Sequence, residues 1–337
     1  MRFTFRQLEY FIAAGECGSI TQASQRTNIS APSISTAISH LERECGVQLF
    51  VRHHAEGLSL TSAGRAMLLE CKQLIQQARG LTSAATDINH KLRGEIRIGC
   101  FVTLVPMIMP ELTYSFGKSH PEAEIRYIEL HQEDLLNGLQ RADIDVAITY
   151  DLSIPDEVAF IPLATLPPYA MVGEASRLRH QSAVTLADLA EQPWVVLDLP
   201  LSHDYFLSLF AAERVEPQIG WRSQHHEIVR AMVANGYGYA LFNVRPRNSV
   251  ALDGRQLYAV PLAGEHRDLQ IGLATLKELK KSRLCLAFEE HCRLRISSTY
   301  IPGMVTLPME RSEQTEAKIR SVRSPRRRER SRKQRDD

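Results

Sequence analysis

The sequence predicts two folded domains joined by one long helix: a mainly α-helical N-terminal domain and a C-terminal α/β domain. Three observations support this fold class. Residues 1–60 contain three amphipathic helical patterns followed by a short hairpin pattern. Residues 61–93 carry an apolar heptad repeat, and residues 94–300 alternate strand and helix patterns. A chain of 337 residues is long enough for each domain to bury its own core.

The first domain begins with three short helices. A capping-box spacing at Thr4 and Gln7 starts a helix over 5–16, and a second helix ends near residue 27. Ser30 caps the third helix, whose inward positions are Ile34, Ile38 and Leu41. Its outward face consists of small polar side chains: Ser33, Ser35, Thr36 and Ser39. On this helical pattern alone, an ordinary three-helix core with a polar face is the alternative interpretation.

A hairpin pattern completes this domain. Leu49–Arg52 and Leu58–Leu60 are predicted strands, and residues 53–57 form the loop between them. Three helices followed by such a hairpin are typical of a winged helix-turn-helix, in which one helix enters the major groove of double-stranded DNA. Small hydroxyl side chains let that helix approach the bases, and the amides at its start attract phosphate.

The charge of this domain does not by itself indicate nucleic-acid binding. The formal net charge of the chain is +1, and residues 1–93 hold ten basic and seven acidic side chains. Residues 318–337 hold ten basic and three acidic side chains. We expect residues 301–337 to be a disordered, low-complexity basic tail. Such a tail is either solvated or adds salt-sensitive attraction to phosphate.

The heptad repeat predicts a long helix over residues 62–92, within a linker segment of residues 61–93. Its seam has a regular four-three spacing and consists of Met67, Cys71, Leu74, Ala78, Leu81, Ala85, Ile88 and Leu92. The helix would be about 45 Å long at ~1.5 Å per residue, so we expect it to pair with a second copy. A homodimer or homotetramer follows from this pairing. Packing of the seam against the chain's own domains is the alternative.

The C-terminal domain is predicted to hold a largely parallel sheet with crossover helices. The expected strands are 95–99, 124–130, 144–148, 194–197 and 237–242, and the expected helices are one from 104, 133–141 and 226–234. Strands at 160–166 and 269–276 are placed to carry the chain between two lobes. We therefore expect lobe I over 94–161 and 268–300, and lobe II over 162–267.

In such sheets a ligand binds beyond the carboxyl ends of the strands, near helix N-termini. Val102, Thr103 and Leu104 follow the first strand at such a place. The Thr103 hydroxyl, beside helix amides, is suited to an anionic group such as a carboxylate. We interpret His225 and His226 as helix-capping residues rather than ligands.

The cysteines and the N-terminus favour a cytoplasmic protein. No apolar run approaches the ~18–20 residues that span a bilayer, and the first residues are amphipathic rather than a signal peptide. The six cysteines form no Cys-x-x-Cys pair and lie near no histidine at zinc spacing, so we expect no metal, no cofactor and no membrane partner. We interpret them as reduced, mostly buried thiols, with a redox-sensing pair as the alternative.

The motifs of the N-terminal domain occur together in one register, and this register resembles the LysR-type transcriptional regulators. The matching segments are Leu8, Phe11, Gly18–Ala23, Ser30–Ser35, Ile38, Leu41–Glu42, Gly46, Leu49–Arg52 and Leu60–Gly64. The second half, to about residue 295, resembles the effector-binding domain of that family, which is similar in fold to periplasmic binding proteins. The chain departs from the family at Ala31, where glutamine is frequent, and at Thr36, where arginine or lysine is common. These departures shift the expected sequence preference toward DNA shape.

The resemblance implies two sets of binding residues. The expected DNA-binding residues are Thr21, Gln22, Ser30, Ala31, Pro32, Ser33, Ser35, Thr36, Ser39 and Arg52. The expected effector-binding residues are Val102, Thr103, Leu104, Gln132, Tyr150, Ser202, His203 and Phe242. The implied partners are promoter DNA, a small anionic metabolite bound between the lobes, further copies of the chain and, for an activator, RNA polymerase.

An enzyme is the rival from a different class, because parallel α/β sheets host many reactions. The sequence contains no Gly-x-Ser-x-Gly elbow, phosphate loop or dinucleotide fingerprint, so we expect no catalytic residues and no enzyme activity. A regulator that is ligand-free or redox-responsive is the nearer alternative. A solute-binding protein is more remote, since it accounts for the second half alone.

Overall fold

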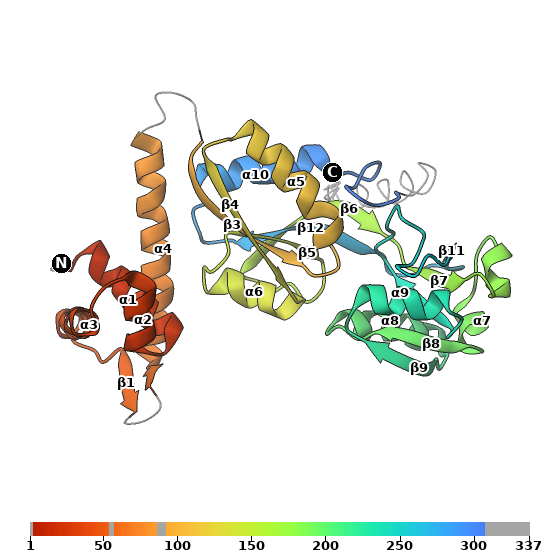
Figure 1. The fold of residues 1–337 in the computed structure, drawn as a ribbon, viewed down its shortest axis with the longest axis horizontal. Helices are drawn as coiled ribbons and strands as arrows, with labels where there is room; N and C mark the ends of the chain where they lie inside the picture. Colours follow the sequence, from red (N-terminus) through yellow and green to blue (C-terminus); the bar gives the residue numbers. More distant parts are fainter. Residues whose placement is uncertain (1–2, 54–56, 86–91, 307–337) are drawn as a thin grey trace, which may run out of the picture.

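The computed structural model describes residues 3–53, 57–85 and 92–306 of the chain (Figure 1). The N-terminal domain contains five elements: α1 (Phe5–Cys17), α2 (Ile20–Thr27), α3 (Ala31–Cys45), β1 (Phe50–His53) and β2 (Gly57–Leu60). The helix α4 (Ser62–Ala85) follows directly and packs against α1. These elements confirm the predicted winged helix-turn-helix.

Local capping explains where the first three helices begin and end. The side chains of Thr4 and Gln7 form a reciprocal capping box at the start of α1. Ser19 and Ser30 each accept a hydrogen bond from a backbone amide of the following helix, α2 and α3. Asn28 adopts a left-handed conformation with φ of 55° after α2, a conformation that asparagine tolerates well. The short turns therefore follow from the residue types present.

The core of the N-terminal domain is small and apolar. Phe11 of α1 is fully buried, and its ring meets that of Phe50 edge to face with centroids 5.4 Å apart. The inward residues of α3 close the core from the other side: Ile34, Ile38 and Leu41. The Glu42 carboxylate accepts hydrogen bonds from the amides of Leu49 and Phe50, at 2.8 and 3.2 Å. This carboxylate fixes the hairpin of β1 and β2 against α3.

The apolar seam of α4 is divided between two environments. Met67 and Cys71 pack against the core of the N-terminal domain, together with Ile75, whereas the side chain of Leu74 is 41% exposed. The seam residues Met67 and Cys71 thus pack on their own chain, as the alternative interpretation holds. The predicted seam position Ile88 lies outside the described residues. Leu74 is available to a second copy.

The C-terminal domain consists of two lobes, each with a five-stranded sheet (Figure 1). Lobe I has the strand order β4-β3-β5-β12-β6 and is covered by α5 (Val105–Ser119), α6 (Gln132–Gln140) and α10 (Arg283–Arg295). Its strands are β3 (Gly94–Phe101), β4 (Ala123–Leu130), β5 (Val146–Tyr150), β6 (Val158–Leu166) and β12 (Leu269–Leu276).

Lobe II has the strand order β11-β7-β10-β8-β9. Its strands are β7 (Tyr169–Gly173), β8 (Pro193–Leu197), β9 (Gln218–Ser223), β10 (Tyr239–Phe242) and β11 (Leu257–Pro261). Its helices are the short η2 (Arg177–His180), α7 (Leu186–Ala190), α8 (Ser202–Glu213) and α9 (His226–Ala234). The chain passes from lobe I to lobe II after β6 and returns through β12.

Both sheets are mixed, which corrects the expectation of a largely parallel sheet. β3 runs parallel to β4 and β5, but β12 is antiparallel to both β5 and β6. In lobe II, β7 is antiparallel to β10 and β11. The physical reason is the crossing between lobes. The outgoing strand β6 and the returning strand β12 lie side by side, so they must run in opposite directions.

The ordered domain continues past residue 300, where the basic tail was expected to begin. Ile301 and Met304 are each only 2% exposed. The amide of Arg247 donates to the Gly303 carbonyl at 2.9 Å, which ties this segment to lobe II. Gly303 has a φ of 70°, and a Cβ there would lie 2.9 Å from Met107 of α5. Pro302 and Gly303 thus form a packed turn, and the predicted tail beyond 306 lies outside the described residues.

Candidate DNA-contacting surface and effector cavity

The predicted DNA-binding residues lie on α2, α3, the turn before α3 and the adjacent strand β1. The side chains of Thr21, Gln22, Pro32, Ser33, Thr36, Ser39 and Arg52 are exposed, as is Ser30, while Ala31 and Ser35 are half-buried. The guanidinium of Arg52 donates to the Ser35 hydroxyl at 3.4 Å, so the hairpin and α3 meet here. Arg52 is the one charged residue of this set. The surface therefore offers small hydroxyl groups rather than long polar side chains.

The polar groups of the turn before α3 are already engaged in hydrogen bonds within the protein. The hydroxyls of Ser30 and Ser33 are 2.7 Å apart, and the amide of Ser33 donates to the Ser30 hydroxyl at 3.4 Å. The hairpin is anchored on the opposite side, where the amide of Leu58 donates to the Gly18 carbonyl at 2.7 Å. These hydrogen bonds fix the start of α3 and hold the hairpin against the turn between α1 and α2.

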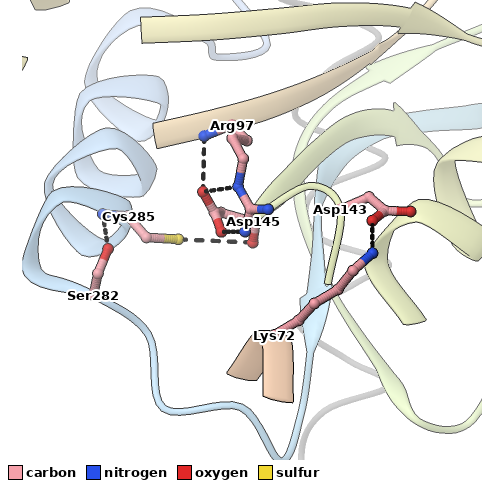
Figure 2. A network of polar contacts seen from close by, with 6 residues as sticks. All are labelled: Lys72, Arg97, Asp143, Asp145, Ser282 and Cys285. Carbon is pink, nitrogen blue, oxygen red and sulfur yellow. Dashed lines mark hydrogen bonds and ion pairs between the residues drawn. The ribbon is translucent and has the colours of Figure 1, made fainter. Parts of the chain in front are cut away.

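A group of charged side chains joins this domain to lobe I. Lys72 of α4 lies 2.8 Å from the Glu16 carboxylate of α1 and also pairs with Asp143, which lies between α6 and β5 (Figure 2). The Lys72 side chain is only 8% exposed. Burial of Glu16 opposes its ionisation, but the hydrogen bond and charge of Lys72, together with Arg26, outweigh this and lower the pKa of the Glu16 carboxyl.

The lobe I side of this contact is held by a second ion pair. Asp145 accepts a hydrogen bond from the backbone amide of Arg97 at 2.7 Å, and its other oxygen lies 2.7 Å from the guanidinium of the same residue (Figure 2). Asp143 is preceded by Ala142, whose φ of 53° places the backbone in the left-handed region. The amide of Asp143 donates to the Gly138 carbonyl of α6 at 2.8 Å, which holds this turn.

A small cavity lies between the two lobes. Lobe I contributes Phe101, Thr103, Tyr150 and Leu269, and lobe II contributes Leu197, Ser202, Phe206, His226, Phe242, Asn243 and Val244. Its volume is about 30 Å³. A cavity needs roughly 10–15 Å³ to hold one water molecule, so the lobes are close together in this structure.

Polar groups in this cavity are buried and mostly neutral. The hydroxyls of Thr103 and Tyr150 are 3.2 Å apart, and the Tyr150 ring meets that of Phe101 edge to face. Burial raises the pKa of the Tyr150 phenol well above its usual range, and the hydrogen bond with Thr103 offsets this only in part. The Asn243 amide donates to the Leu166 carbonyl at 2.8 Å, which fixes the turn after β10.

Four of the eight expected effector-binding residues line this cavity: Thr103, Tyr150, Ser202 and Phe242. Leu104 is fully buried in the core of lobe I, and Val102 packs against that core. Gln132 is committed to structure, because its amide donates to the carbonyls of Tyr150 and Leu152 at 3.1 and 2.8 Å. His203 packs against Trp194, with ring centroids 5.9 Å apart. Val102, Leu104, Gln132 and His203 therefore do not line the cavity.

Seven lining residues were missed by the sequence reasoning: Phe101, Leu197, Phe206, His226, Asn243, Val244 and Leu269. Asn243 and Val244 follow the carboxyl end of β10, so the rule that found Thr103 applies to them as well. The capping interpretation of the histidine pair holds only for the position of His225, which is the N-cap residue of α9. His225 stands at the start of α9 without a side-chain capping bond, and His226 lines the cavity.

Within residues 3–53, 57–85 and 92–306, no three or more histidine, cysteine, aspartate or glutamate side chains cluster in a way that could bind a metal ion. None of the helices in this part of the chain combines the length and apolarity needed to cross a membrane.

A winged helix-turn-helix joined to a two-lobed α/β domain is the architecture of a class of DNA-binding regulators. Comparison with known families identifies the particular one. The model of the bacterial regulatory helix-turn-helix protein, lysR family, matches residues 5–65. The LysR substrate binding domain matches residues 89–296, more than half of the chain. The chain belongs to the LysR family of DNA-binding transcriptional regulators.

Individual relatives agree with this assignment. The chain is 27% identical over 277 residues to the transcriptional regulator YvbU of Bacillus subtilis, covering 82% of this chain and 93% of YvbU. It is 34% identical to HinK, a LysR family transcriptional regulator from Pseudomonas aeruginosa, with a TM-score of 0.60, covering 88% of this chain and 99% of HinK. Full-length CbnR, solved with its target DNA, shares the fold at 24% identity with a TM-score of 0.51, covering 87% and 99% of the two chains.

Proposed function

We propose that this protein regulates transcription by binding promoter DNA as a homo-oligomer, under the control of a small molecule that binds between the lobes of its C-terminal domain. The observation that carries this proposal is the cavity, because its lining comes from both lobes. A molecule that fills it must change the separation of the lobes. Such a ligand shifts a hinge equilibrium only as far as it binds one arrangement better than the other.

The small size of the cavity supports a closed arrangement that opens to admit the effector. Pockets for small molecules typically hold roughly 300–1,000 Å³, far more than the about 30 Å³ seen here. The strands β6 and β12 connect the lobes and are the natural hinge. When the lobes separate, lobe I moves relative to the DNA-binding domain that it contacts.

The Lys72 contact is the proposed route from lobe I to the DNA-binding domain. Lys72 belongs to α4, touches Glu16 of the helix-turn-helix domain, and pairs with Asp143 of lobe I. Because its side chain is nearly buried, its charge is poorly screened by solvent. A movement of lobe I that displaces Asp143 therefore acts directly on the orientation of α4.

Self-association is supported by exposed apolar side chains at three places. Leu74 projects from α4, Tyr127 and Ile128 from the sheet-edge strand β4, and Ile219 and Trp221 from the sheet-edge strand β9. Open sheet edges with exposed apolar residues favour pairing with another chain. A dimer presents two copies of α3 to half-sites that are spaced by turns of DNA. The proposed location is the cytoplasm, where promoter DNA lies, and an activating role would add RNA polymerase as a partner.

Four of the six described thiols, those of the buried cysteines, oppose the redox-responsive alternative. Burial raises the pKa of Cys71 to about 11 and that of Cys285 to about 12, and it raises the pKa values of Cys100 and Cys292 further. The thiolate is the form that reacts with oxidants, and these four thiols resist forming it. We propose neither redox sensing nor catalysis for this chain.

A gel-shift experiment tests the DNA-binding part of the proposal. Thr36→Glu places a negative charge on the exposed face of α3, and we expect affinity for the DNA upstream of the protein's own gene to fall roughly tenfold or more, since single contacts to DNA are worth about 1–3 kcal/mol. Gln181→Glu adds the same charge to an exposed position of lobe II and serves as the control. Equal binding by both variants would contradict the assignment of α3.

A further inference from the structure

One residue that lines the cavity has a ring nitrogen atom without a hydrogen-bond partner among the described residues. His226 is the first residue of α9, and its ring packs against Phe242 with centroids 4.7 Å apart. Its side chain is 16% exposed, but its Nε2 atom is buried and unpaired within the described part of the chain. Buried polar atoms are nearly always hydrogen-bonded in folded proteins. The unpaired Nε2 in a cavity lining therefore indicates a position for a ligand.

The other ring nitrogen fixes what kind of group Nε2 can bind. Nδ1 lies 3.2 Å from a carboxylate oxygen of Glu227, which can only accept, so Nδ1 carries the proton. This hydrogen bond from His226 is the largest influence on the Glu227 carboxyl and lowers its pKa, with burial opposing and Arg230 assisting. In the neutral ring, Nε2 is then a bare acceptor. It accepts a hydrogen bond from a hydroxyl or from a protonated carboxyl group.

The remaining lining limits the charge of the ligand. Phe101, Phe206, Phe242, Leu197, Val244 and Leu269 are apolar, and Thr103, Tyr150, Ser202 and Asn243 are neutral. No lysine, arginine, aspartate or glutamate is among the residues that line this cavity in the described structure. A ligand with two negative charges would lose its hydration without finding a counter-ion. The three phenylalanine rings favour an apolar or aromatic body.

We propose that the cavity binds a small, largely apolar molecule with a single hydroxyl or carboxyl group, and that His226 Nε2 is the atom that binds this group. The inference rests on the proposed effector control. It narrows the expected anionic metabolite to a molecule with only one hydroxyl or carboxyl group. A hydroxyl donates to Nε2 directly. A carboxyl group donates to Nε2 only in its protonated form.

Other charged groups near the ring do not change this requirement. Glu227 and Arg230, both on α9, pair with each other at 3.3 Å, and Glu227 also accepts from Nδ1. From lobe I, the titratable group in the lining is Tyr150, which burial keeps in its protonated form by raising its pKa. None of these groups donates a hydrogen bond to Nε2 in the described structure, so the donor has to come from the ligand.

Thermal unfolding of the full-length protein with three probes tests this inference. The probes are phenol, benzoate and succinate at millimolar concentration, because a ligand that binds the folded state raises the melting temperature. His226→Phe keeps the ring against Phe242 but removes both nitrogens. His225→Phe makes the same change at the exposed neighbouring residue and is the matched control. His226→Gln is the rescue variant, since its amide reaches the place of Nε2.

We expect phenol or benzoate to raise the melting temperature of the wild type and of His225→Phe, and succinate to have no effect. The shift should disappear in His226→Phe and return in part in His226→Gln. The inference would be overturned if succinate raised the melting temperature more than phenol and benzoate did. It would also be overturned if His226→Phe showed the same shift as the wild type, or if no probe shifted the melting temperature of the wild type. Operator binding by the same variants, measured by gel shift, separates this failure from a failure of the proposed regulatory function.

Discussion

α3 and the residues beside it present their candidate DNA contacts from one continuous segment, residues 21–52, whereas the cavity takes its lining from positions as distant as Phe101 and Leu269. The DNA-contacting surface is exposed, hydroxyl-rich and supported by a core of its own. The cavity is buried, aromatic and shared between two lobes. A substitution on the α3 surface should therefore change only the affinity for DNA. A substitution at the cavity should change how lobe I and lobe II are arranged relative to each other.

The independence of the N-terminal core is tested most severely by Phe11→Ala. Phe11 is fully buried and its ring contacts Phe50. The substitution should lower the free energy of unfolding of the DNA-binding domain by about 3–5 kcal/mol, because it leaves a cavity in a small core. Calorimetry should show an earlier first transition and an unchanged transition of the C-terminal domain. Phe5→Ala, on the same helix but 52% exposed, is the control. A common shift of both transitions would contradict the separation.

A smaller effect is expected at the cavity itself. Tyr150→Phe removes the hydroxyl that lies 3.2 Å from Thr103 and keeps the ring against Phe101. The unfolding free energy of the C-terminal domain should fall by about 0.5–1.5 kcal/mol, the net value of one hydrogen bond. Tyr127→Phe, on the exposed face of β4, should leave it unchanged. Denaturant unfolding measures both free energies. Equal values for the two variants would show that the Tyr150 hydroxyl does not stabilise the fold.

The smallest expected effect is a pH dependence confined to the N-terminal domain. The pKa of Glu16 is lowered below its ordinary 4.5 in the folded protein. Its ion pairs therefore stabilise the fold fully above that value, and the contribution is lost as the pH falls through the lowered pKa. In a urea unfolding series from neutral pH to below 4.5, Glu16→Gln should flatten this part of the profile. Glu9→Gln, at an exposed position of the same helix, should preserve the wild-type profile.

The N-terminal domain was predictable because its signals are local. The capping residues Thr4, Ser19 and Ser30 and the apolar positions of α3 lie within a few residues of what they determine. The packing of α4 was less predictable. Cys71 has the spacing of a dimer seam, yet it packs against its own domain. Periodicity shows that a face is apolar but not which partner covers it.

The cavity was predictable only in part, because its lining depends on how the two lobes meet. Thr103 follows the end of a strand, and the topological rule places it correctly near the cleft. Gln132 has a suitable residue type, but it is used to hold the carbonyls of Tyr150 and Leu152. His226 was missed because its position at the start of a helix suggested capping. The mixed direction of the sheets also escaped prediction, since antiparallel pairing of β6 with β12 joins segments about a hundred residues apart.

The central claim is that filling the space between the lobes alters DNA binding at a distance, and Ser202→Trp tests it most directly. Ser202 is buried at the cavity, so the indole should force the lobes apart without any ligand. Ser208→Trp makes the same change at an exposed position of α8 and is the control. Coupling between sites is typically worth about 1–3 kcal/mol, so the operator affinity of Ser202→Trp should differ from wild type by roughly fivefold or more, with Ser208→Trp unchanged. Identical operator affinity for the folded Ser202→Trp variant and the wild type would contradict the account.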